Sequence, residues 1–385
     1  MLKCASIHTF EADSPELALN EIKEQLDKKI TLLEHSAGIV MCHPEFIATG
    51  VLKYICENLP FDLAGITTSS QAVNDEAGEL ILTIFVMTSD DVRFIGGVTE
   101  SVKDGIDGPV KAAYEKAAAG ISDTPKLTLV FPPFALHSGD AYVRAWEKAA
   151  SGTPVFGTFA IDDTATFEEC RTIYNGISYK DTMPFILCYG NIRPRFAVAT
   201  LSESNAVTTK AEVTKASGNC VYEINHINAR RYFEDLEFAG SVAFTPFLID
   251  LLKREDYDGV AVVRGHAIFT EDGAAIFYGD VDEGSTFTML SFDADDIVSA
   301  TRQALEKINR LSNVNGALLF PCVVRRVALL GINKPLLELQ TARDTINPEI
   351  PYMAGYAGGE LCPTSVRDGI PVNRFHNYSL IILVI

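Results

Sequence analysis

The sequence predicts an α/β protein of two lobes, with mixed sheets built from repeated strand–helix–strand units and an added antiparallel meander. Three observations lead to this prediction. The chain has 385 residues, which is more than a single hydrophobic core usually organises. One order of apolar and helical segments occurs three times. Before its third occurrence, apolar and polar residues alternate around Asp-Gly and Glu-Gly turns, as in an antiparallel meander.

The first helix is predicted at 13–26. Ser14 is its expected cap, Pro15 takes the first helical position, and Leu17, Ile22 and Leu26 are expected toward one face. Three repeated units follow. Each has an apolar strand, a helical stretch, a short apolar segment after a proline, a polar loop, and a closing apolar strand.

The units open with the strands 37–42, 127–132 and 316–321 and close with the strands 80–87, 184–190 and 379–385. The helical stretch is clearest at 138–150, where Ser138 is the expected cap. The short middle segments end at Gly65, Gly157 and Gly355, which predicts positive φ or a close backbone approach. Each strand–helix–strand core predicts parallel pairing. Chance alternation, which any α/β protein shows, is the alternative to true repetition.

Between the second and third units, the sequence pattern changes from strand–helix alternation to one typical of antiparallel strands. The meander is predicted at 256–290, and an amphipathic helix at 293–310 has acids at its start and bases at its end, which matches the helix dipole. We therefore divide the chain into one α/β domain at 1–205 and another at 206–385. The boundary is expected between residues 203 and 220.

The chain is acidic, with a formal net charge of −19. This charge repels nucleic acids and anionic lipid surfaces, and it favours a cationic or amine-bearing ligand. The eight cysteines form no Cys-x-x-Cys pair, the start lacks the apolar h-region of a signal peptide, and the apolar run 379–385 is too short to span a bilayer. These features predict a cytoplasmic protein with mostly buried thiols.

The main candidate binding element is the loop 355–360, which reads Gly-x-x-Gly-Gly-Glu. It matches neither the dinucleotide nor the Walker pattern. Its candidate residues are Gly355, Tyr356, Gly358, Gly359 and Glu360. Backbone N–H groups in such a bend hold a carboxylate or a carbonyl, and Glu360 accepts hydrogen bonds from an ammonium group or from hydroxyls. A tight structural turn with a solvated glutamate is the alternative.

Other candidates follow the strands of the units. Arg325 comes soon after the third opening strand, and its planar guanidinium suits a carboxylate. With Glu360 for the amine, it makes an amino-acid-like site; a structural ion pair between the two is the alternative. Thr67 and Thr68 follow the glycine of the first unit, and Asp162 and Asp163 follow that of the second, so these four residues are further ligand candidates. Ordinary loops and a capped turn are their alternatives.

Catalysis finds little support, because neither a Gly-x-Ser-x-Gly elbow nor a His-Glu-x-x-His motif is present. We predict no catalytic residue, no metal ligand and no cofactor, although an enzyme with a nucleophile assembled in space stays open. Cys362 and Pro363 resemble the Cys-Pro dipeptide of some haem-binding proteins, and His376 would be a second haem ligand. A core histidine is the alternative.

Together these segments resemble the FIST family of sensory proteins, with its N-terminal and C-terminal domains, over roughly residues 30 to 385. The resemblance is clearest in "GALLFPCVVRRVALLG", "AGYAGGELCP" and "RFHNYSLIILV" of the C-terminal half, and "FYGDVDEGSTFTML" fits its middle. In the N-terminal half it rests on "FDLAGITTSS" and "PVFGTFAIDDT". The segments "ITTSS" and "YAGGE" depart from the Ser-Thr-x-Gly-Glu type of many members, which leaves the ligand class open.

The resemblance implies a cytoplasmic sensor of small molecules, amino acids among them, that takes part in signal transduction. It implies partners such as histidine kinases, chemotaxis receptors or cyclic-dinucleotide enzymes, and one branch of the family implies haem and nitric oxide sensing. Arg325 and Glu360 match the family's arginine and Gly-Glu positions, and Gly355 and Gly359 match its glycines. We therefore expect a non-enzymatic sensor that binds a small polar metabolite and acts through a separate output protein.

Overall fold

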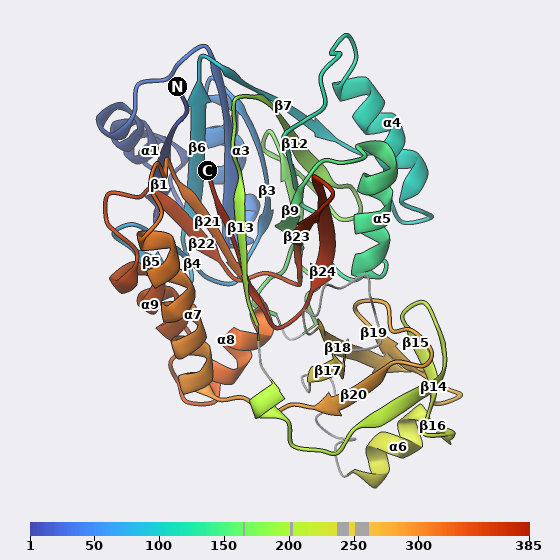
Figure 1. The fold of residues 1–385 in the computed structure, drawn as a ribbon. Coiled ribbons are helices and arrows are strands. Elements are labelled where there is room, and N and C mark those ends of the chain that lie inside the picture. The colour runs from blue at the N-terminus through green and yellow to red at the C-terminus, as the bar shows by residue number, and fades with distance from the viewer. Residues whose placement is uncertain (165, 201–202, 237–245, 251–261) are drawn as a thin grey trace.

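The computed structural model describes residues 1–164, 166–200, 203–236, 246–250 and 262–385 (Figure 1). Three six-stranded sheets make up a large lobe, and a seven-stranded sheet with one short helix forms a smaller lobe beside it. The predicted α/β class with mixed sheets is confirmed. The start of the predicted meander, residues 256–261, lies outside the described residues.

The first three sheets share one strand order. The first sheet runs β1 (Lys3–Thr9), β6 (Leu82–Ser89), β2 (His35–Cys42), β3 (Asp62–Thr67), β10 (Thr172–Tyr174) and β11 (Ile177–Tyr179). The second runs β7 (Val92–Val98), β12 (Pro184–Gly190), β8 (Leu127–Val130), β9 (Val155–Thr158), β23 (Glu360–Arg367) and β24 (Ile370–His376). The third runs β13 (Arg195–Ala199), β25 (Leu380–Val384), β21 (Ala317–Pro321), β22 (Tyr352–Gly355), β4 (Gln71–Val73) and β5 (Ala77–Gly78).

This shared order confirms the predicted repetition. In each sheet the opening strand pairs in parallel with the second strand of its own unit and antiparallel with the closing strand. A crossover of helices joins the two parallel strands, as parallel pairing requires. The helices of the large lobe are α1 (Pro15–Lys29), α2 (Glu45–Ala48), α3 (Val51–Glu57), α4 (Asp107–Ala117), α5 (Gly139–Ala149), α7 (Ala294–Asn309), α8 (Val323–Leu330) and α9 (Leu337–Thr345).

The units exchange hairpins in a cycle, which the sequence did not indicate. The hairpin β4–β5 follows the first unit's second strand but pairs with β22 of the third sheet. Hairpin β10–β11 of the second unit pairs with β3 of the first sheet. Hairpin β23–β24 of the third unit pairs with β9 of the second sheet. Each sheet is therefore completed by a segment from another unit.

The smaller lobe is antiparallel and is inserted between β13 and α7 along the chain. Its sheet runs β14 (Ala211–Ser217), β20 (Thr286–Met289), β17 (Pro246–Asp250), β18 (Val262–Phe269), β19 (Ala275–Phe277), β15 (Cys220–Ile224) and β16 (Ile227–Asn228). A further pairing of β14 with β15 curls it into a half-barrel. The helix α6 (Ala229–Asp235) and the short 3-10 helix Glu203–Asn205 complete the described elements.

Local sequence explains the helix ends. Asp293 and Asp296 form a capping box at the start of α7, and Lys307 lies in its last turn, so the predicted dipole match is confirmed. Ser14 caps α1 by accepting from the Leu17 N–H. Leu17 itself is 55% exposed, so its predicted place on the buried face is wrong. It precedes Ile22 by five residues, which at 3.6 residues per turn is about 140° around the helix, so the two side chains do not share a face.

Glycines allow the parallel strands to approach each other. A Cβ atom at Gly65 would lie 1.7 Å from the Val40 carbonyl oxygen, and one at Gly157 would lie 1.8 Å from the Val130 oxygen. Close backbone approach is thus confirmed at these two positions, and neither has positive φ. Gly355 differs, because a Cβ there would meet the Met41 side chain instead. Strand register makes its neighbour Ala354 the counterpart of the other two glycines.

Candidate ligand-binding site

The loops after the three second strands meet in the interior of the large lobe, where one hydrogen-bonded ring joins all three units. The bonds run from Ile161 N to Thr67 O (3.1 Å), from Gly358 N to Phe159 O (3.0 Å), and from Thr68 Oγ1 to Tyr356 O (2.6 Å). Thr67, Thr68 and Tyr356 are fully buried. The structure therefore brings together the candidates Thr67, Thr68 and the loop 355–360, which are almost 300 residues apart.

Most of the glycine loop is buried as well. A Cβ at half-buried Gly358 would overlap the Phe134 ring and Ile161. Gly359 has a φ of +125°, which residues with a side chain rarely adopt, and a Cβ there would overlap the Phe375 ring. Two glycines thus permit a tight bend between packed aromatic rings. This bend places Glu360, the first residue of β23, in the interior of the lobe.

Glu360 has two counterparts, because every exchanged hairpin begins at the same register position. Gln71 pairs with Gly355, Thr172 pairs with Ile66, and Glu360 pairs with Thr158, each one residue beyond the equivalent strand position. The Gln71 amide donates to the Ile81 carbonyl and accepts from Thr83 Oγ1. The Thr172 hydroxyl donates to the Thr182 carbonyl. Both counterparts are therefore neutral side chains with their hydrogen bonds satisfied.

Glu360 departs from this pattern. Its Oε2 accepts from Ser379 Oγ at 2.7 Å, and its Oε1 has no hydrogen bond of normal geometry among the described residues, although the Cys322 thiol, a weak donor, lies close to the carboxyl. The residue is fully buried, and burial raises its pKa well above the usual range, although Ser379 and the nearby Cys322 thiol oppose the rise. Burial therefore favours the neutral form of this carboxyl over its charged form. An acid oxygen buried without a hydrogen bond lowers stability, and such an exception calls for an explanation.

Arg325 lies close by but is already paired. Its guanidinium is 1% exposed and binds Glu338 of α9 through Nη2 at 2.7 Å and Nε at 2.9 Å. Thr301 Oγ1 accepts a further bond from Nη2 and donates to the same Glu338 carboxylate. The predicted alternative of an ion pair between Arg325 and Glu360 is wrong, since the partner is Glu338. Nothing in the sequence around Glu338, on an amphipathic helix, marked it as a buried partner.

The two aspartates of the second loop have separate surroundings. Asp162 is 1% exposed and accepts from the Thr164 N–H and hydroxyl and from the Glu169 N–H, so it caps its own turn. Asp163 is half exposed and lies 3.2 Å from His43 Nε2. The predicted alternative of a capped turn therefore describes Asp162. Among the described residues, no group of three or more acids, histidines and cysteines is arranged to hold a metal ion.

His376 and Cys362 do not fit a haem as they are arranged. Both side chains are buried, with exposures of 5% and 0%. His376 Nε2 lies 3.1 Å from the Cys362 carbonyl, and the Cys362 thiol packs in the central core. Burial lowers the pKa of His376 to about 4, so its ring is neutral. The predicted alternative of a core histidine matches these surroundings.

A short turn between β24 and β25 connects the buried acid to the smaller lobe. Ser379 binds Glu360, and Asn377 Oδ1 accepts from the Gly265 N–H of β18. Between them, Tyr378 has a φ of +60°, and its ring packs against Phe292. A residue with a side chain adopts such a φ only where its surroundings impose it, often at functional sites. No signal beyond the polar residues "HNYS" indicated this turn in advance.

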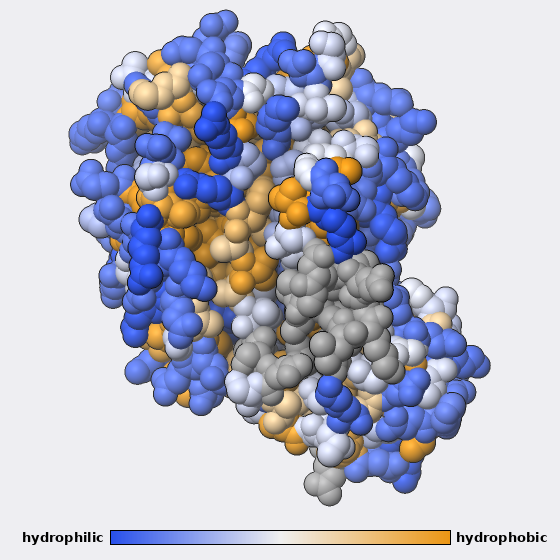
Figure 2. Space-filling model, viewed as in Figure 1, coloured by the Kyte–Doolittle hydropathy of each residue, from blue (hydrophilic) through white to orange (hydrophobic). Residues whose placement is uncertain are grey.

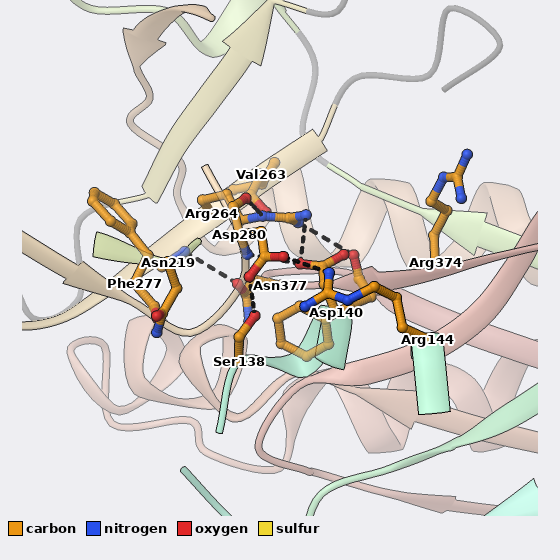
Figure 3. Close-up of polar contacts among 12 residues, drawn as sticks. Ser138, Asp140, Arg144, Asn219, Val263, Arg264, Phe277, Asp280, Arg374 and Asn377 are labelled. Carbon is orange, nitrogen blue, oxygen red and sulfur yellow. Dashed lines mark hydrogen bonds and ion pairs between the residues drawn. The ribbon is translucent and has the colours of Figure 1, made fainter. Parts of the chain in front are cut away.

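Polar contacts fasten the smaller lobe to the large lobe next to this turn (Figure 3). Arg264 of β18 reaches Asp140 of α5 at 3.1 Å, donates to the Phe375 carbonyl of β24, and is 1% exposed. Asp140 also accepts from the Asp280 N–H. The Asp280 carboxylate in turn accepts from Ser138, which precedes α5, and from Arg144 in the middle of α5. Ser138 was predicted to cap α5 and instead donates to Asp280; an arginine within an apolar strand was the available signal for this junction.

The fold and the buried acid define a class of protein: an α/β protein of three interlocked repeats and a smaller lobe, with a polar group held open in its interior. The chain belongs to the FIST family. The model of the FIST N domain matches residues 36–227, and the model of the FIST C domain matches residues 229–363. These domains form a small-ligand-binding module of sensory and signalling proteins, and the sensory role follows from the family alone.

A comparison with curated proteins gives no match. Among the described residues, no helix has the length and apolar character needed to cross a membrane.

Proposed function

We propose that this protein is a sensor whose small polar ligand contacts Glu360. The observation that carries the proposal is the open Oε1 atom of this buried acid, at a position where Gln71 and Thr172 are fully hydrogen-bonded. Three related positions in one chain provide an internal reference for a structural residue. Only the third combines an ionisable group with an unmet hydrogen bond, and a ligand group would satisfy it.

The ligand class follows from the state of this carboxyl. An ammonium group would let Glu360 ionise and form a charge-assisted bond, whereas a hydroxyl or amide suits its neutral form. We propose an amino acid or a similar small metabolite that bears an amine or hydroxyls. The net charge of −19 favours such a ligand over a polyanion.

The proposed site consists of Glu360 and the loop around it, with Tyr356 and the ring residues Thr67 and Thr68 as its frame. Asp162 and Asp163 lie on the neighbouring loop, outside this frame. Arg325 supports the frame by holding Glu338 beside Tyr356. A ligand carboxylate would have to displace Glu338 to reach Arg325, so we assign the ligand's recognition to its amine or hydroxyl end.

The signal would pass through the turn between β24 and β25. A ligand on Glu360 would alter its bond to Ser379, and the same turn binds Gly265 of the smaller lobe through Asn377. The shift between lobe arrangements cannot exceed the ligand's differential affinity for the two states. We propose that a separate cytoplasmic signalling protein reads this shift, such as a histidine kinase, a chemotaxis receptor or a cyclic-dinucleotide enzyme. All eight cysteines are free, as in a reducing compartment.

Native mass spectrometry of the purified protein, with a thermal-shift screen of amino acids and polyamines, tests the proposal. We expect a bound mass or a shift of several degrees for one compound class. Glu360→Gln should abolish the response to an amine, and Ser379→Ala should leave a ligand-binding protein. A response that survives unchanged in folded Glu360→Gln would refute Glu360 as the ligand contact.

A further inference from the structure

A groove runs between the first residues of β13 and the β23–β24 hairpin, away from Glu360. It has a volume of about 590 Å³, which is within the range of binding sites. Its walls come from three separated segments around residues 124, 153 and 195 and from the hairpin at 363–371. Figure 2 shows hydrophobic residues gathered on this face of the large lobe around β13.

One wall of the groove is the edge strand β13. Of the strands that the structure describes, only β25 pairs with it, so its other edge presents unpaired backbone groups. Its counterparts in the other sheets are β1 and β7. Five of the seven residues of β1 are buried, whereas one of the seven residues of β7 and none of the five residues of β13 is. Phe196 to Ala199 carry no charge that would protect this edge against another strand.

The opposite walls offer apolar surface and few backbone donors. Five lining residues are prolines, which lack an N–H group: Pro125, Pro154, Pro194, Pro363 and Pro371. The hairpin tip carries Val366 and Ile370, which are 70% and 56% exposed. Backbone hydrogen bonding to an occupant is therefore concentrated on β13, and side-chain contacts on the hairpin.

The charge of the groove is opposite to that of the chain. Its lining includes Lys126 and Arg195 and no acidic residue, although the chain has 51 acids and 32 bases. Arg195 donates to the backbone carbonyls of Ser312 and Asn313, and no acid of the described part of the chain forms an ion pair with it. At physiological ionic strength charges act over about 8 Å, so these local bases outweigh the distant acids. An acidic occupant is favoured here and is repelled elsewhere.

We propose that this groove receives an extended acidic segment of a partner protein, with apolar side chains alternating with acids, which adds a strand to the free edge of β13. Strand addition gives affinity through backbone bonds, and alternate side chains give specificity. Acidic residues of the segment form ion pairs with Lys126 and Arg195, and its apolar residues pack on Phe196 and Val366. This proposal rests on the proposed function only in assuming a separate partner protein. The groove itself does not include Glu360.

The test uses random ten-residue peptides displayed on phage and selected on the full chain. We expect enrichment of alternating acidic and apolar residues. Fluorescence polarisation of a selected peptide should show at least tenfold weaker binding to Val366→Glu and to Lys126→Glu, and weaker binding at high salt. Lys23→Glu, an exposed charge reversal on α1, is the matched control and should bind as the parent does. Thermal unfolding verifies that all three variants fold.

Selected peptides without acidic enrichment, or equal binding to the groove variants, would overturn the proposal. So would a dimer in sedimentation that Val366→Glu dissociates, because a second copy would then be the occupant. N-methylation of alternate peptide bonds should abolish binding if a strand is added. A Glu360→Gln protein that loses its small ligand but keeps the peptide separates this proposal from the proposed function.

Discussion

The buried pair of Arg325 and Glu338 allows a sharp test of how the site is built. Glu338→Gln removes the countercharge from a guanidinium that is 1% exposed and bonded at 2.7 Å. Breaking a buried ion pair from one side costs about 3–5 kcal/mol, because the remaining charge stays buried without a partner. Since folded proteins are stable by only about 5–15 kcal/mol, this loss is large.

Equilibrium urea unfolding of the full chain measures the effect. We expect Arg325→Met and Glu338→Leu each to be strongly destabilised, and the double variant to be more stable than either, because apolar replacement of both partners is often neutral. The half-exposed pair of Arg343 and Asp344 is the control, and Asp344→Asn should cost at most about 0.5 kcal/mol. A loss below about 1 kcal/mol in Glu338→Gln would refute the reasoning.

The same double variant separates support of the fold from contact with the ligand. If Arg325 only holds Glu338 and the frame, the folded double variant should bind the amino-acid-like ligand with an unchanged Kd. A loss of about 2–5 kcal/mol in binding by a folded double variant would instead assign Arg325 to a ligand carboxylate. Isothermal titration of the parent and the double variant measures the difference.

Three further predictions concern pH and packing. Burial lowers the pKa of His376 to about 4, so the native state binds fewer protons than the unfolded state. About 3 kcal/mol of stability should therefore be lost as pH falls from 6.5 to 4. His376→Gln should flatten this part of the plot of unfolding free energy, measured with urea, against pH. Burial raises the pKa of Glu360, so its effect on stability has the opposite sign: stability falls as pH rises above the ordinary carboxyl range. Relative to the parent, Glu360→Gln should therefore become more stable with rising pH. Gln71→Glu, which buries a new acid, should become less stable. Gly65→Ala should cost at least about 3 kcal/mol by thermal unfolding, whereas Gly108→Ala, with open space around its Cβ, should cost little.

Local sequence predicted the repeated units well. Proline placement, apolar strands and the Asp293 cap are short-range signals, and the strand pairings of all three units agree with them. The exchange of hairpins was not predictable, because a turn of two or three residues does not determine which sheet its hairpin will join. Partners at long range decide that, such as Thr158 for Glu360.

The candidate site was predicted in part. The loop 355–360 and the threonines of the first unit were identified separately, and their contact through Thr68 and Tyr356 came only with the fold. The burial of Glu360 was missed, because an acid after a glycine-rich bend resembles a surface turn. Arg264 and Asn377 were also missed, since each acts through a partner more than 100 residues away.

The cyclic exchange of hairpins has a consequence for biosynthesis. The strand β9 is made by residue 158, but its outer neighbour β23 begins only at residue 360. While the ribosome makes the intervening residues, the second sheet is incomplete. The free edge of β9 is then open to pairing with strands of other chains. The second sheet therefore cannot be completed until residues 360–376 have been translated. Protection of that edge by a chaperone should matter more for this protein than for one whose repeats complete themselves in order.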